Sequence, residues 1–193
     1  MTDYVQNIYF VHPSSVIDEN VVIGEGTKIW YFCHVQSGAI IGNNCTFGQN
    51  VNISNNVKIG DFCKVQNNVS IYEGVELEDY VFCGPSCVFT NDLTPRAKNP
   101  KGRKNYIKTL VKEGASIGAN STIICGNTIG KYALIGAGAV VTTNVPDYAV
   151  MVGVPAQRVG WACECGHILS DDLCCKKCNR IYRKTSNGLE EIE

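Results

Sequence analysis

The sequence contains no long hydrophobic run and carries almost no net charge. No apolar segment in its 193 residues approaches the roughly 20 residues that a membrane-spanning helix needs. The residues Met1 to Tyr4 do not place a basic segment before an apolar one, so we expect no signal peptide and a cytoplasmic location. A formal net charge of −1 and a charged fraction of 18% do not provide the basic surface that nucleic-acid binding requires. We therefore expect neither a membrane nor a nucleic acid as a partner.

Histidine is scarce as well, because the chain has 3 histidines and none lies between His34 and His167. Histidine is the most frequent general base in enzymes, so a histidine-based mechanism is not expected in this long central stretch. Methionine occurs only 2 times, whereas glycine occurs 19 times. This balance favours a β architecture with many turns over a helical one.

What the chain does contain is a repeat of six residues. An apolar, mostly aliphatic residue returns at every sixth position, and glycine, asparagine, aspartate or glutamate commonly follows it. A helix repeats on about 3.6 residues and an isolated strand on about two, so a period of six predicts short strands separated by tight corners. This is the pattern of a hexapeptide β-solenoid. The apolar series consists of Val11, Ile17, Ile23, Ile29, Val35, Ile41, Phe47, Ile53, Ile59, Val65, Ile71, Leu77, Cys83 and Phe89, and resumes with Val111, Ile117, Ile123, Ile129, Ile135 and Val141.

Each hexad has a second inward position, four residues after the first. This position and the first position of the next hexad are two residues apart, so both side chains point into the solenoid. Cysteine occupies the second position at Cys33, Cys45, Cys63 and Cys87. We interpret these four cysteines as small core residues, because buried free cysteine behaves as a small hydrophobe. Three hexads make one triangular coil, which predicts about six and two-thirds coils and a prism about 32 Å tall.

One basic insertion, from Thr94 to Leu110, interrupts the repeat. Its cationic residues include Arg96, Arg103 and Lys104. A solvated surface loop is the simpler interpretation. We favour a functional excursion, since insertions on a rigid scaffold often carry binding residues. The basic side chains would suit a ligand with phosphate groups, such as a nucleotide pyrophosphate.

Stacking the hexads in threes aligns the corner residues into columns. The three faces are named A, B and C, beginning with the hexad at Val11, on the assumption that the insertion skips no face. The third-position column after face B places Glu73 and Asn91 one coil apart, where the insertion leaves the barrel, and Asp92 follows. The corresponding column after face A contains Gln49, Asn67, Pro85, Ala119 and Ala137. A polar pocket that leads into a groove of small residues would suit a long, thin cofactor.

The closing run resembles the end of a hexapeptide-repeat acyltransferase barrel; it reads IGAGAVVTTNVPDYAVMVGVPAQRVG over residues 135–160. The segments GQNVNI, VQNNVSIYEGVELEDYVFCGPSCVFTND, TPRA and IGANSTIICGNTIG more specifically resemble the N-acetyltransferases of nucleotide-linked 3-amino sugars. These enzymes make acetamido sugars for surface polysaccharides, and their substrates include UDP-linked uronates and dTDP-linked 3-amino-3,6-dideoxyhexoses. The resemblance covers nearly all of residues 11–160. It implies an all-β, left-handed parallel β-helix with a protruding loop.

The resemblance also implies an activity. It predicts a homotrimer whose active sites lie between neighbouring prisms, with acetyl-CoA along the groove as co-substrate. The acceptor would be the amino group, at C3, of a nucleotide-linked amino sugar. Asn91 matches the asparagine of the family's FTN segment, and Asp92 matches an acidic residue of the branch that acts on neutral sugars, which favours a deoxyhexose. We hypothesise that Asn91 orients the amine, that Asp92 helps to remove its proton, and that a backbone N–H in the 118–126 corner region holds the thioester oxygen.

The other predicted site residues come from the columns, the loop and the end of the barrel. Predicted substrate contacts are Glu73, Asn67, Gln49 and Arg96, and predicted cofactor contacts are Ala119, Gly126, Ala137, Gly138 and Arg158. Some of the predicted site residues have a simpler alternative, and Arg96 would then be merely exposed. Asn91 would be a corner residue chosen for left-handed dihedral angles, and Glu73 would be a solvated corner residue.

A cysteine-rich segment follows the barrel. Cys163-x-Cys165 and Cys175-x-x-Cys178 are close to the two knuckles of a zinc ribbon. Four thiolates around Zn²⁺ would form a closed, structural site and supply the stability that so small a module lacks. The first pair is one residue short of the usual spacing, and Cys174 competes with Cys175. Iron and a pair of disulfides remain alternatives.

These observations divide the chain into three parts. We predict a barrel over residues 1–160 with the loop 94–110 inserted, a zinc-ribbon-like module over 161–183, and a flexible tail over 184–193. Two other functions compete with the acetyltransferase: a non-catalytic scaffold whose zinc ribbon binds a partner, and a transferase with a different acyl acceptor or donor. A carbonic-anhydrase-like metal site needs several barrel histidines, and only His12 and His34 are present, so we exclude it.

Overall fold

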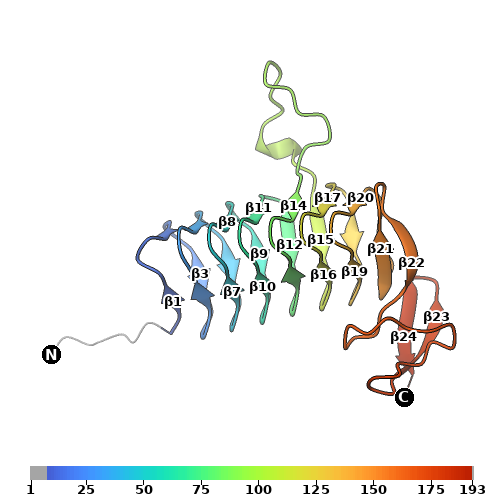
Figure 1. The fold of residues 1–193 in the computed structure, drawn as a ribbon. Helices are drawn as coiled ribbons and strands as arrows, with labels where there is room; N and C mark the ends of the chain where they lie inside the picture. The colour runs from blue at the N-terminus through green and yellow to red at the C-terminus, as the bar shows by residue number, and fades with distance from the viewer. Residues whose placement is uncertain (1–7, 193) are drawn as a thin grey trace.

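The chain folds into a three-sided parallel β-solenoid followed by a small β module (Figure 1). The computed structural model describes residues 8–192. Sheet A contains β1 (Phe10–Val11), β4 (Lys28–Ile29), β7 (Thr46–Phe47), β10 (Lys64–Val65), β13 (Phe82–Cys83), β16 (Ser116–Ile117), β19 (Leu134–Ile135), β21 (Ala149–Val152) and β22 (Gln157–Trp161). Sheet B contains β2 (Val16–Ile17), β5 (His34–Val35), β8 (Asn52–Ile53), β11 (Ser70–Ile71), β14 (Val88–Phe89), β17 (Thr122–Ile123) and β20 (Val140–Val141). Sheet C contains β3 (Val22–Ile23), β6 (Ile40–Ile41), β9 (Lys58–Ile59), β12 (Val75–Leu77), β15 (Thr109–Val111) and β18 (Thr128–Ile129).

The strand register confirms the predicted coil of three hexads. Before the insertion, Lys64 pairs with Phe82 on sheet A and Ser70 pairs with Val88 on sheet B, each one coil along. Across the insertion, β12 pairs directly with β15, so the loop skips no face. The loop therefore adds residues at one corner without shifting the repeat, and the columns drawn from the sequence are the columns of the structure.

The inward positions form one continuous core along the prism. Ile29, Val35, Phe47 and Ile71 are fully buried, as the alternation of the hexads predicts. The predicted core cysteines are confirmed as well, since Cys33, Cys45, Cys63 and Cys87 are at most 3% exposed. The thiols of three of them also contact a backbone carbonyl of the same corner one coil further along, with Sγ to O distances of 3.0 Å for Cys33 and 3.1 Å for both Cys45 and Cys63. Burial raises the pKa of the Cys33 thiol, which makes it a poor nucleophile.

Side-chain ladders stabilise the corners between sheets C and A. The Oδ1 atom of Asn43 accepts the N–H of Glu25 at 2.9 Å, and Asp61 accepts the N–H of Asn43 at 2.6 Å. Asp79 in turn accepts the N–H of Asp61 at 2.7 Å. The corner N–H of one coil is thus satisfied by an Asx side chain of the next, which explains why asparagine and aspartate recur at this position.

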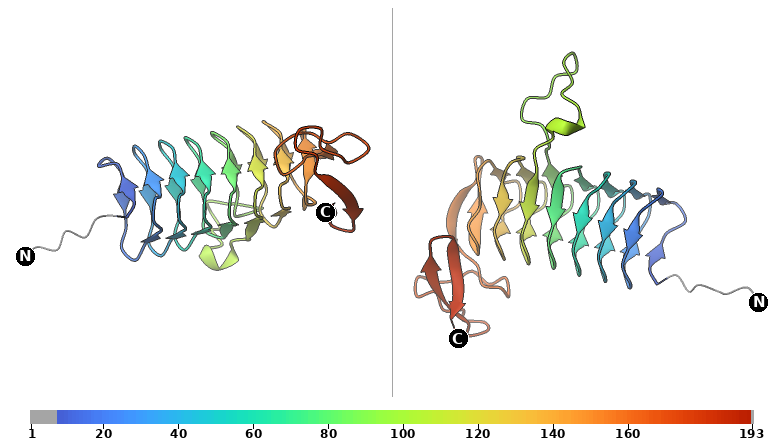
Figure 2. Two further views of the ribbon diagram at one scale, coloured as in Figure 1. Left: turned by 90° about the horizontal axis from the view of Figure 1, so that it is seen from below. Right: turned by 180° about the vertical axis from the view of Figure 1, so that it is seen from behind.

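The module after the barrel has more order than the sequence suggests. Strands β23 (Ile181–Thr185) and β24 (Gly188–Ile192) form an antiparallel hairpin over most of the expected flexible tail. Leu189 of the hairpin is only 3% exposed, and the N–H of Asp147 in the barrel donates to Asn187 at 2.9 Å. The prediction of a flexible tail is wrong here, because a short, charged strand lacks the apolar pattern by which a buried strand is predicted from the sequence. Figure 2 shows the hairpin beside the last coils in both views.

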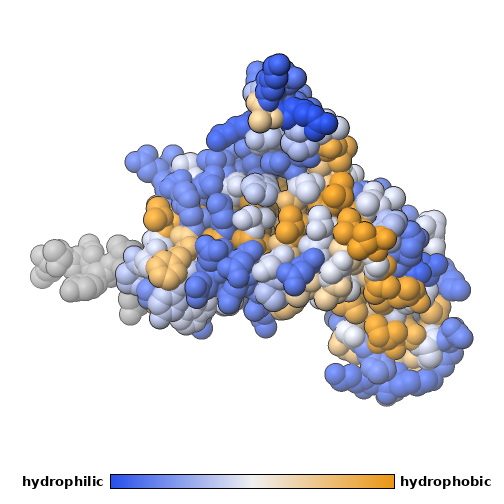
Figure 3. All heavy atoms as spheres, turned by 45° about the horizontal axis from the view of Figure 1, so that its top comes forward, coloured by the Kyte–Doolittle hydropathy of each residue, from blue (hydrophilic) through white to orange (hydrophobic). Residues whose placement is uncertain are grey.

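The insertion projects from the corner between sheets B and C, as Figures 1 and 2 show. Its only regular element within the described residues is the short 3₁₀ helix η1 (Arg103–Asn105). The loop surface is strongly hydrophilic in Figure 3. No helix in the described part of the chain is long and apolar enough to cross a membrane.

Candidate functional site

Two corners of the prism carry the predicted site residues. We call the corner between a sheet A strand and the following sheet B strand the AB corner, and the next one the BC corner. Asn91 directly follows β14 at the BC corner, where the insertion begins. Its carbonyl accepts the N–H of Ile107 at 2.9 Å, so the outgoing and returning strands of the loop are joined beside it. This bond fixes the Asn91 backbone and leaves its half-buried side chain available at the base of the loop.

The backbone of Asn91 is not left-handed. The corner residues with positive φ are one position further along, as at Asn56 with φ of 59° and Gly74 with φ of 97°, whereas Asn91 has no positive φ. The interpretation of Asn91 as a residue chosen for left-handed dihedrals is therefore wrong. Backbone conformation therefore does not explain why an asparagine occupies this position, and the group that distinguishes it is its side-chain amide.

Asp92 lies in a local network of the loop. Its Oδ1 atom lies 2.7 Å from the Lys101 Nζ and 2.8 Å from the N atom of Thr94. The hydrogen bond from Lys101, followed by that from the Thr94 N–H, lowers the pKa of the Asp92 carboxyl group. Asp92 is therefore ionised at neutral pH, and it is a weaker proton acceptor than an ordinary aspartate.

Glu73, one coil before Asn91, is in contact with the insertion. The Arg103 Nε atom lies 3.6 Å from the Glu73 carboxylate, and an Arg103 Nη2–H donates to Asn55 at 3.3 Å. Glu73 also accepts a hydrogen bond from the Asn56 amide at 3.2 Å. The loop thus folds back over the BC corner and positions a guanidinium there. In contrast, Arg96 is exposed, and its one side-chain hydrogen bond within residues 8–192 is to the adjacent Pro95 carbonyl, at 3.0 Å.

The AB corner contains a pocket of about 430 Å³ that is lined by both polar and apolar groups, a size suited to a small ligand moiety. Among the residues that line this pocket are Tyr31, Gln49, Gln66 and Asn67. The side-chain oxygen of Asn67 accepts the N–H of Gln49 at 2.9 Å. Gln49 and Asn67 are thus brought together, as the column drawn from the sequence predicts.

The side-chain ladder of the AB corner ends beyond Asn67. The next residues of the column are Pro85, Ala119 and Ala137, which have no polar side-chain atom to accept a corner N–H. Within residues 8–192, no hydrogen-bond partner is found for the N–H of Ala119. At Gly118, a Cβ atom would lie 2.6 Å from the backbone nitrogen of Ala137, so the coils approach closely here. The result is a smooth corner with an available backbone donor.

Within one chain, these two groups lie on opposite edges of sheet B. Asn91, Asp92 and Glu73 are at the BC corner, whereas Gln49 and the small residues are at the AB corner. Gly126 was grouped with the small residues from the sequence, but it lies at the BC corner, where a Cβ atom would approach Ile107. Gly138 is exposed beside Ala137. Arg158 on β22 is exposed and stacks over Trp161, with 4.2 Å from its guanidinium carbon to the ring centroid.

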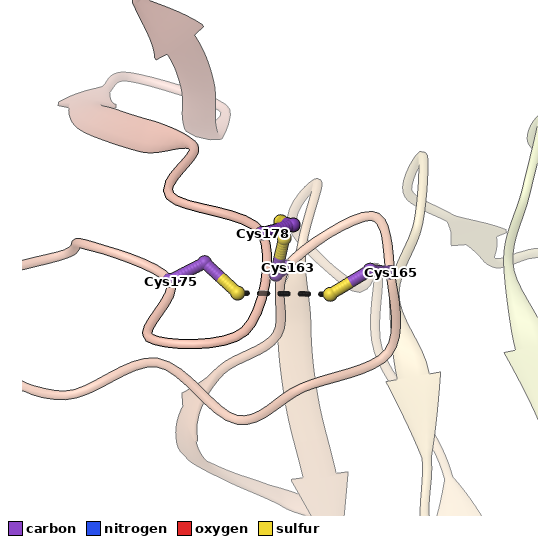
Figure 4. Close-up of side chains that lie close together, drawn as sticks. All are labelled: Cys163, Cys165, Cys175 and Cys178. Atoms are coloured by element: carbon purple, nitrogen blue, oxygen red, sulfur yellow. Dashed lines mark hydrogen bonds between the residues drawn. The ribbon is translucent and has the colours of Figure 1, made fainter.

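The four predicted metal ligands do converge (Figure 4). The Sγ atoms of Cys163, Cys165, Cys175 and Cys178 all lie within 4.8 Å of one another. Zn–S bonds of about 2.3 Å place tetrahedral sulfur ligands about 3.8 Å apart, which this cluster fits. Cys174 lies outside the cluster, and its N–H is bonded to Asp172 at 3.0 Å. The fold therefore resolves the ambiguity between the two neighbouring cysteines.

The environment of the cluster differs between its two sides. Burial raises the pKa of the Cys163 thiol to about 12, and its Sγ lies 3.1 Å from the Tyr182 hydroxyl. On the other side, hydrogen bonds from the backbone and then the guanidinium of Arg180 lower the pKa of Cys178 to about 6. The guanidinium nitrogen lies 3.3 Å from the Cys178 sulfur. A cationic donor beside this set of thiols favours the anionic thiolates that a metal requires.

Aromatic packing joins the cysteine cluster to the barrel. Tyr148 of the last coil stacks on Tyr132 with ring centroids 5.3 Å apart, and it contacts Tyr182 of the hairpin at 5.1 Å. Leu169 and Leu189 complete this small core. The module therefore covers the end of the barrel through a shared apolar contact.

Known transferases resemble this chain over most of its length. The family model for bacterial transferase hexapeptides (six repeats) matches residues 20–55. The model for the hexapeptide repeat of succinyl-transferase matches residues 38–73 and 113–143. The dTDP-3-amino-3,6-dideoxy-alpha-D-galactopyranose 3-N-acetyltransferase of Aneurinibacillus thermoaerophilus is 44% identical over 95% of each chain. The bifunctional protein GlmU of Shouchella clausii is 31% identical over 74% of this chain and 29% of its own.

Solved structures resemble the fold. GDP-perosamine N-acetyltransferase from Caulobacter crescentus, in complex with CoA and GDP-perosamine, superposes with a TM-score of 0.51 and 24% identity over 78% of this chain and 55% of its own. The acetyltransferase domain of PglB from Neisseria gonorrhoeae, in complex with acetyl coenzyme A, gives a TM-score of 0.52 and 18% identity, with 79% and 58% covered. This chain thus spans a little more than half of each of these two solved chains.

Proposed function

The chain belongs to the hexapeptide-repeat N-acetyltransferases of nucleotide-linked amino sugars, and we propose that it transfers the acetyl group of acetyl-CoA to the C3 amine of such a sugar. The observation that carries this proposal is the 44% identity to a dTDP-3-amino-3,6-dideoxygalactose 3-N-acetyltransferase over 95% of both chains. The match spans both the barrel and the module, so a shared substrate class is a reasonable inference. Its product would serve the synthesis of surface polysaccharides in the cytoplasm, and the free cysteines are compatible with that reducing compartment.

The proposed enzyme is a homotrimer in which sheet B faces the three-fold axis. The outward row of the sheet B strands contains no Lys, Arg, Asp or Glu, and its His34 contacts Asp18 just beyond β2 at 2.9 Å. In contrast, Lys28 and Lys64 occupy the outward row of sheet A, and Lys58 and Glu76 that of sheet C. Charged residues are depleted in the centres of protein interfaces. A three-fold axis at sheet B would place the AB corner of one subunit beside the BC corner of the next. The site residues at the BC corner of one subunit and those at the AB corner of the next would then face each other.

The proposed reaction forms one C–N bond and breaks one C–S bond. The neutral amine attacks the thioester carbonyl, and the thiolate leaves and, together with the amine's proton, gives free CoA thiol. We assign to the Asn91 amide the orientation of the amine. The N–H of Ala119 in the neighbouring subunit would hold the thioester oxygen as it gains charge.

We expected Asp92 to help remove the proton from the amine, and its environment favours a different contribution. Its pKa is lowered by Lys101 and the Thr94 N–H, so the carboxylate holds a proton weakly. We propose that its negative charge attracts the amino group to Asn91. Glu73 would then contact the sugar nucleotide from one coil away, and Gln49 and Asn67 would contact it from the opposite corner.

Arg103 is the best-placed cation for the pyrophosphate of the sugar nucleotide. It is anchored by Glu73 and Asn55, one and two coils before Asn91. We expect Arg103→Ala to raise the KM for the sugar nucleotide roughly tenfold, because a charge-assisted hydrogen bond is worth about 1.5–3 kcal/mol. Arg96→Ala is the matched comparison and should have a smaller effect, since no acidic side chain in the described part of the chain pairs with Arg96. Steady-state kinetics at saturating acetyl-CoA measure both, and a larger effect for Arg96 would reverse the assignment.

The smooth AB corner is the proposed acetyl-CoA groove, with Ala119, Ala137 and Gly138 along it and Arg158 near the CoA phosphates. Filling it with a large side chain should block the cofactor. We expect Ala137→Trp to raise the KM for acetyl-CoA about tenfold or more, because the introduced ring clashes with the bound pantetheine. The KM for the sugar nucleotide should change little. Glu25→Trp, at an exposed position of the corner between sheets C and A, is the control; an equal effect there would contradict the groove.

A direct assay tests the proposed function. Thymidine- and uridine-linked 3-amino and 4-amino sugars are each mixed with acetyl-CoA, and the released free thiol is recorded. We expect the fastest release with a dTDP-linked 3-amino-3,6-dideoxyhexose. Absence of thiol release with every acceptor, from a folded trimer, would favour the non-catalytic scaffold. Release with another acyl donor or acceptor only would favour a different transferase.

We also propose a structural metal, most simply zinc, at the four clustered cysteines. Cys163, Cys165, Cys175 and Cys178 provide four sulfur ligands with spacings that fit a tetrahedral ion. A bound ion would cross-link the two cysteine segments. With four protein ligands the site has no open position, so it would stabilise the module and take no part in the transfer.

A further inference from the structure

The first coils carry an aromatic cluster that the barrel does not need. Trp30 and Tyr31 follow β4 at the AB corner and are 39% and 45% exposed. Their rings are nearly parallel, with an angle of 12° and centroids 6.5 Å apart. The His12 ring packs against Tyr31 with a centroid distance of 3.7 Å. The corresponding corner positions of later coils contain glycine, glutamine, asparagine, proline and alanine, so the corner itself does not require these rings.

The rings of Trp30 and Tyr31 form one wall of the pocket at the AB corner. Its other wall includes Gln49, Gln66 and Asn67. No hydrogen bond within residues 8–192 involves the side-chain amides of Gln49 or Gln66, and the Asn67 amide uses only its oxygen. The pocket therefore combines flat aromatic surface with several available amide donors and acceptors. This is the combination that recognises a nucleobase, through stacking on its faces and hydrogen bonds at its edge.

The distance from the proposed reaction centre also suits a nucleotide. Asn91 lies at the BC corner, so in the proposed trimer it would face Tyr31 from the neighbouring subunit. Tyr31 follows β4, and Asn91 lies at the level of β13, three strands further along sheet A. At about 4.8 Å for each coil, the axial separation is about 14 Å. This is close to the length of an extended sugar nucleotide from its sugar amine to its base. Arg103 is held between these levels, where the pyrophosphate would lie.

From this juxtaposition we propose that Tyr31, supported by His12 and Trp30, stacks on the pyrimidine base of the sugar nucleotide. Gln49, Gln66 and Asn67 bind the edge of the base. The inference rests on the proposed function, because it uses Asn91 and Arg103 to orient the ligand. The adenine of CoA is the other base that could occupy the pocket. The groove for CoA runs from Ala119 toward the opposite end of the prism, so the sugar nucleotide is the assigned occupant.

Binding of free nucleotides to the intact protein tests the proposal without requiring turnover. The Kd values of dTDP, UDP and CoA are measured by calorimetry for the wild type, Tyr31→Ala and Tyr31→Phe. We expect Tyr31→Ala to weaken dTDP binding about tenfold or more, since base–aromatic stacking contributes about 1–3 kcal/mol. Tyr31→Phe should retain most of the affinity because it keeps the ring. CoA binding should be unchanged in both variants.

Tyr80→Ala is the matched control. Tyr80 is also an exposed aromatic corner residue, 54% exposed, and it stacks on Phe62 at 4.9 Å, but it lies at the corner between sheets C and A. Its removal should leave the dTDP affinity unchanged. Gln49→Ala provides a second variant on the polar wall and should also weaken dTDP binding. The proposal is overturned if Tyr31→Ala binds dTDP as the wild type does, or if it loses CoA binding instead.

The outcomes separate this subsite from the proposed function. If no amino sugar is acetylated but dTDP binding depends on Tyr31, the subsite stands and the acetyltransferase assignment fails. If acetylation occurs and the KM for the sugar nucleotide is the same in Tyr31→Ala and the wild type, the enzyme assignment stands and the subsite fails.

Discussion

Replacing Asn91 by alanine should lower kcat for acetyl transfer by about a hundredfold to a thousandfold, the range found when one well-placed polar group is removed from an active site. Asn91 has its backbone fixed at the base of the loop and no left-handed dihedral to explain it. Its half-buried amide is therefore the group most specifically placed to orient the amine. The variant should remain a folded trimer, because the substitution removes no core contact. Thiol release at saturating substrates measures kcat, and size-exclusion chromatography monitors the assembly.

Ser37→Ala is the control for Asn91→Ala. Ser37 belongs to the same corner column three coils earlier. Its backbone carbonyl accepts hydrogen bonds from the Asn55 amide at 3.4 Å and from the N–H of Asn56 at 3.2 Å, and within residues 8–192 its hydroxyl has no hydrogen-bond partner. Its replacement should leave kcat within about a factor of two, as expected of a surface substitution. Full turnover in Asn91→Ala would remove Asn91 from the mechanism. Loss of the trimer in that variant would instead show that the residue acts through assembly.

Replacing Cys175 by serine should remove the bound metal, whereas replacing the adjacent Cys174 should not. The Sγ atom of Cys175 lies 3.6 Å from that of Cys165 inside the four-sulfur cluster, while Cys174 lies outside it. Metal content by mass spectrometry should fall from about one ion per chain to almost none in Cys175→Ser. It should remain near the wild-type value in Cys174→Ser. The two variants differ by one position in the chain, so they test the fold of the module directly.

Loss of the ion should also unfold the module before the barrel. Apparent metal-binding free energies of about 10–16 kcal/mol in small zinc modules show how much stability a structural ion can supply. We expect Cys175→Ser, or treatment of the wild type with a strong chelator, to produce a separate low-temperature transition in calorimetry. The barrel transition should persist, because its core from Ile23 to Val145 is independent of the cysteines of the module. Equal metal content in both serine variants would contradict the assigned ligand set.

The barrel could be predicted almost completely from the sequence because its interactions repeat at a fixed interval. A period of six places the same two side chains in the core of every hexad, and the strand pairs have the predicted register on both sides of the insertion. The columns at the corners follow from that register alone. The pairing of Gln49 with Asn67 and the position of Asn91 at the base of the loop could therefore be predicted from the sequence.

The folding of the insertion and of the C-terminal hairpin could not be predicted from the sequence, because neither follows the six-residue repeat. The basic residues of the loop appear equivalent in the sequence, and only the return of the loop over the BC corner distinguishes Arg103 from Arg96. Gly126 and Ala119 are both small corner residues, yet they occupy different edges of sheet B. In the hairpin, β24 was mistaken for a flexible tail because its burial depends on contacts with Tyr148 and with its partner strand.

The sequence by itself determined the solenoid, the level of each residue along its axis and the set of cysteines from which the four-sulfur cluster is drawn. These features depend on local periodicity and spacing, which the chain records directly. The tertiary structure decided which arginine lies over the BC corner, which of two adjacent cysteines joins the cluster, and that the aromatic residues of the first coils share a pocket with Gln49 and Asn67. Each of these depends on contacts between distant segments, whose geometry is set by packing and not by the hexad repeat.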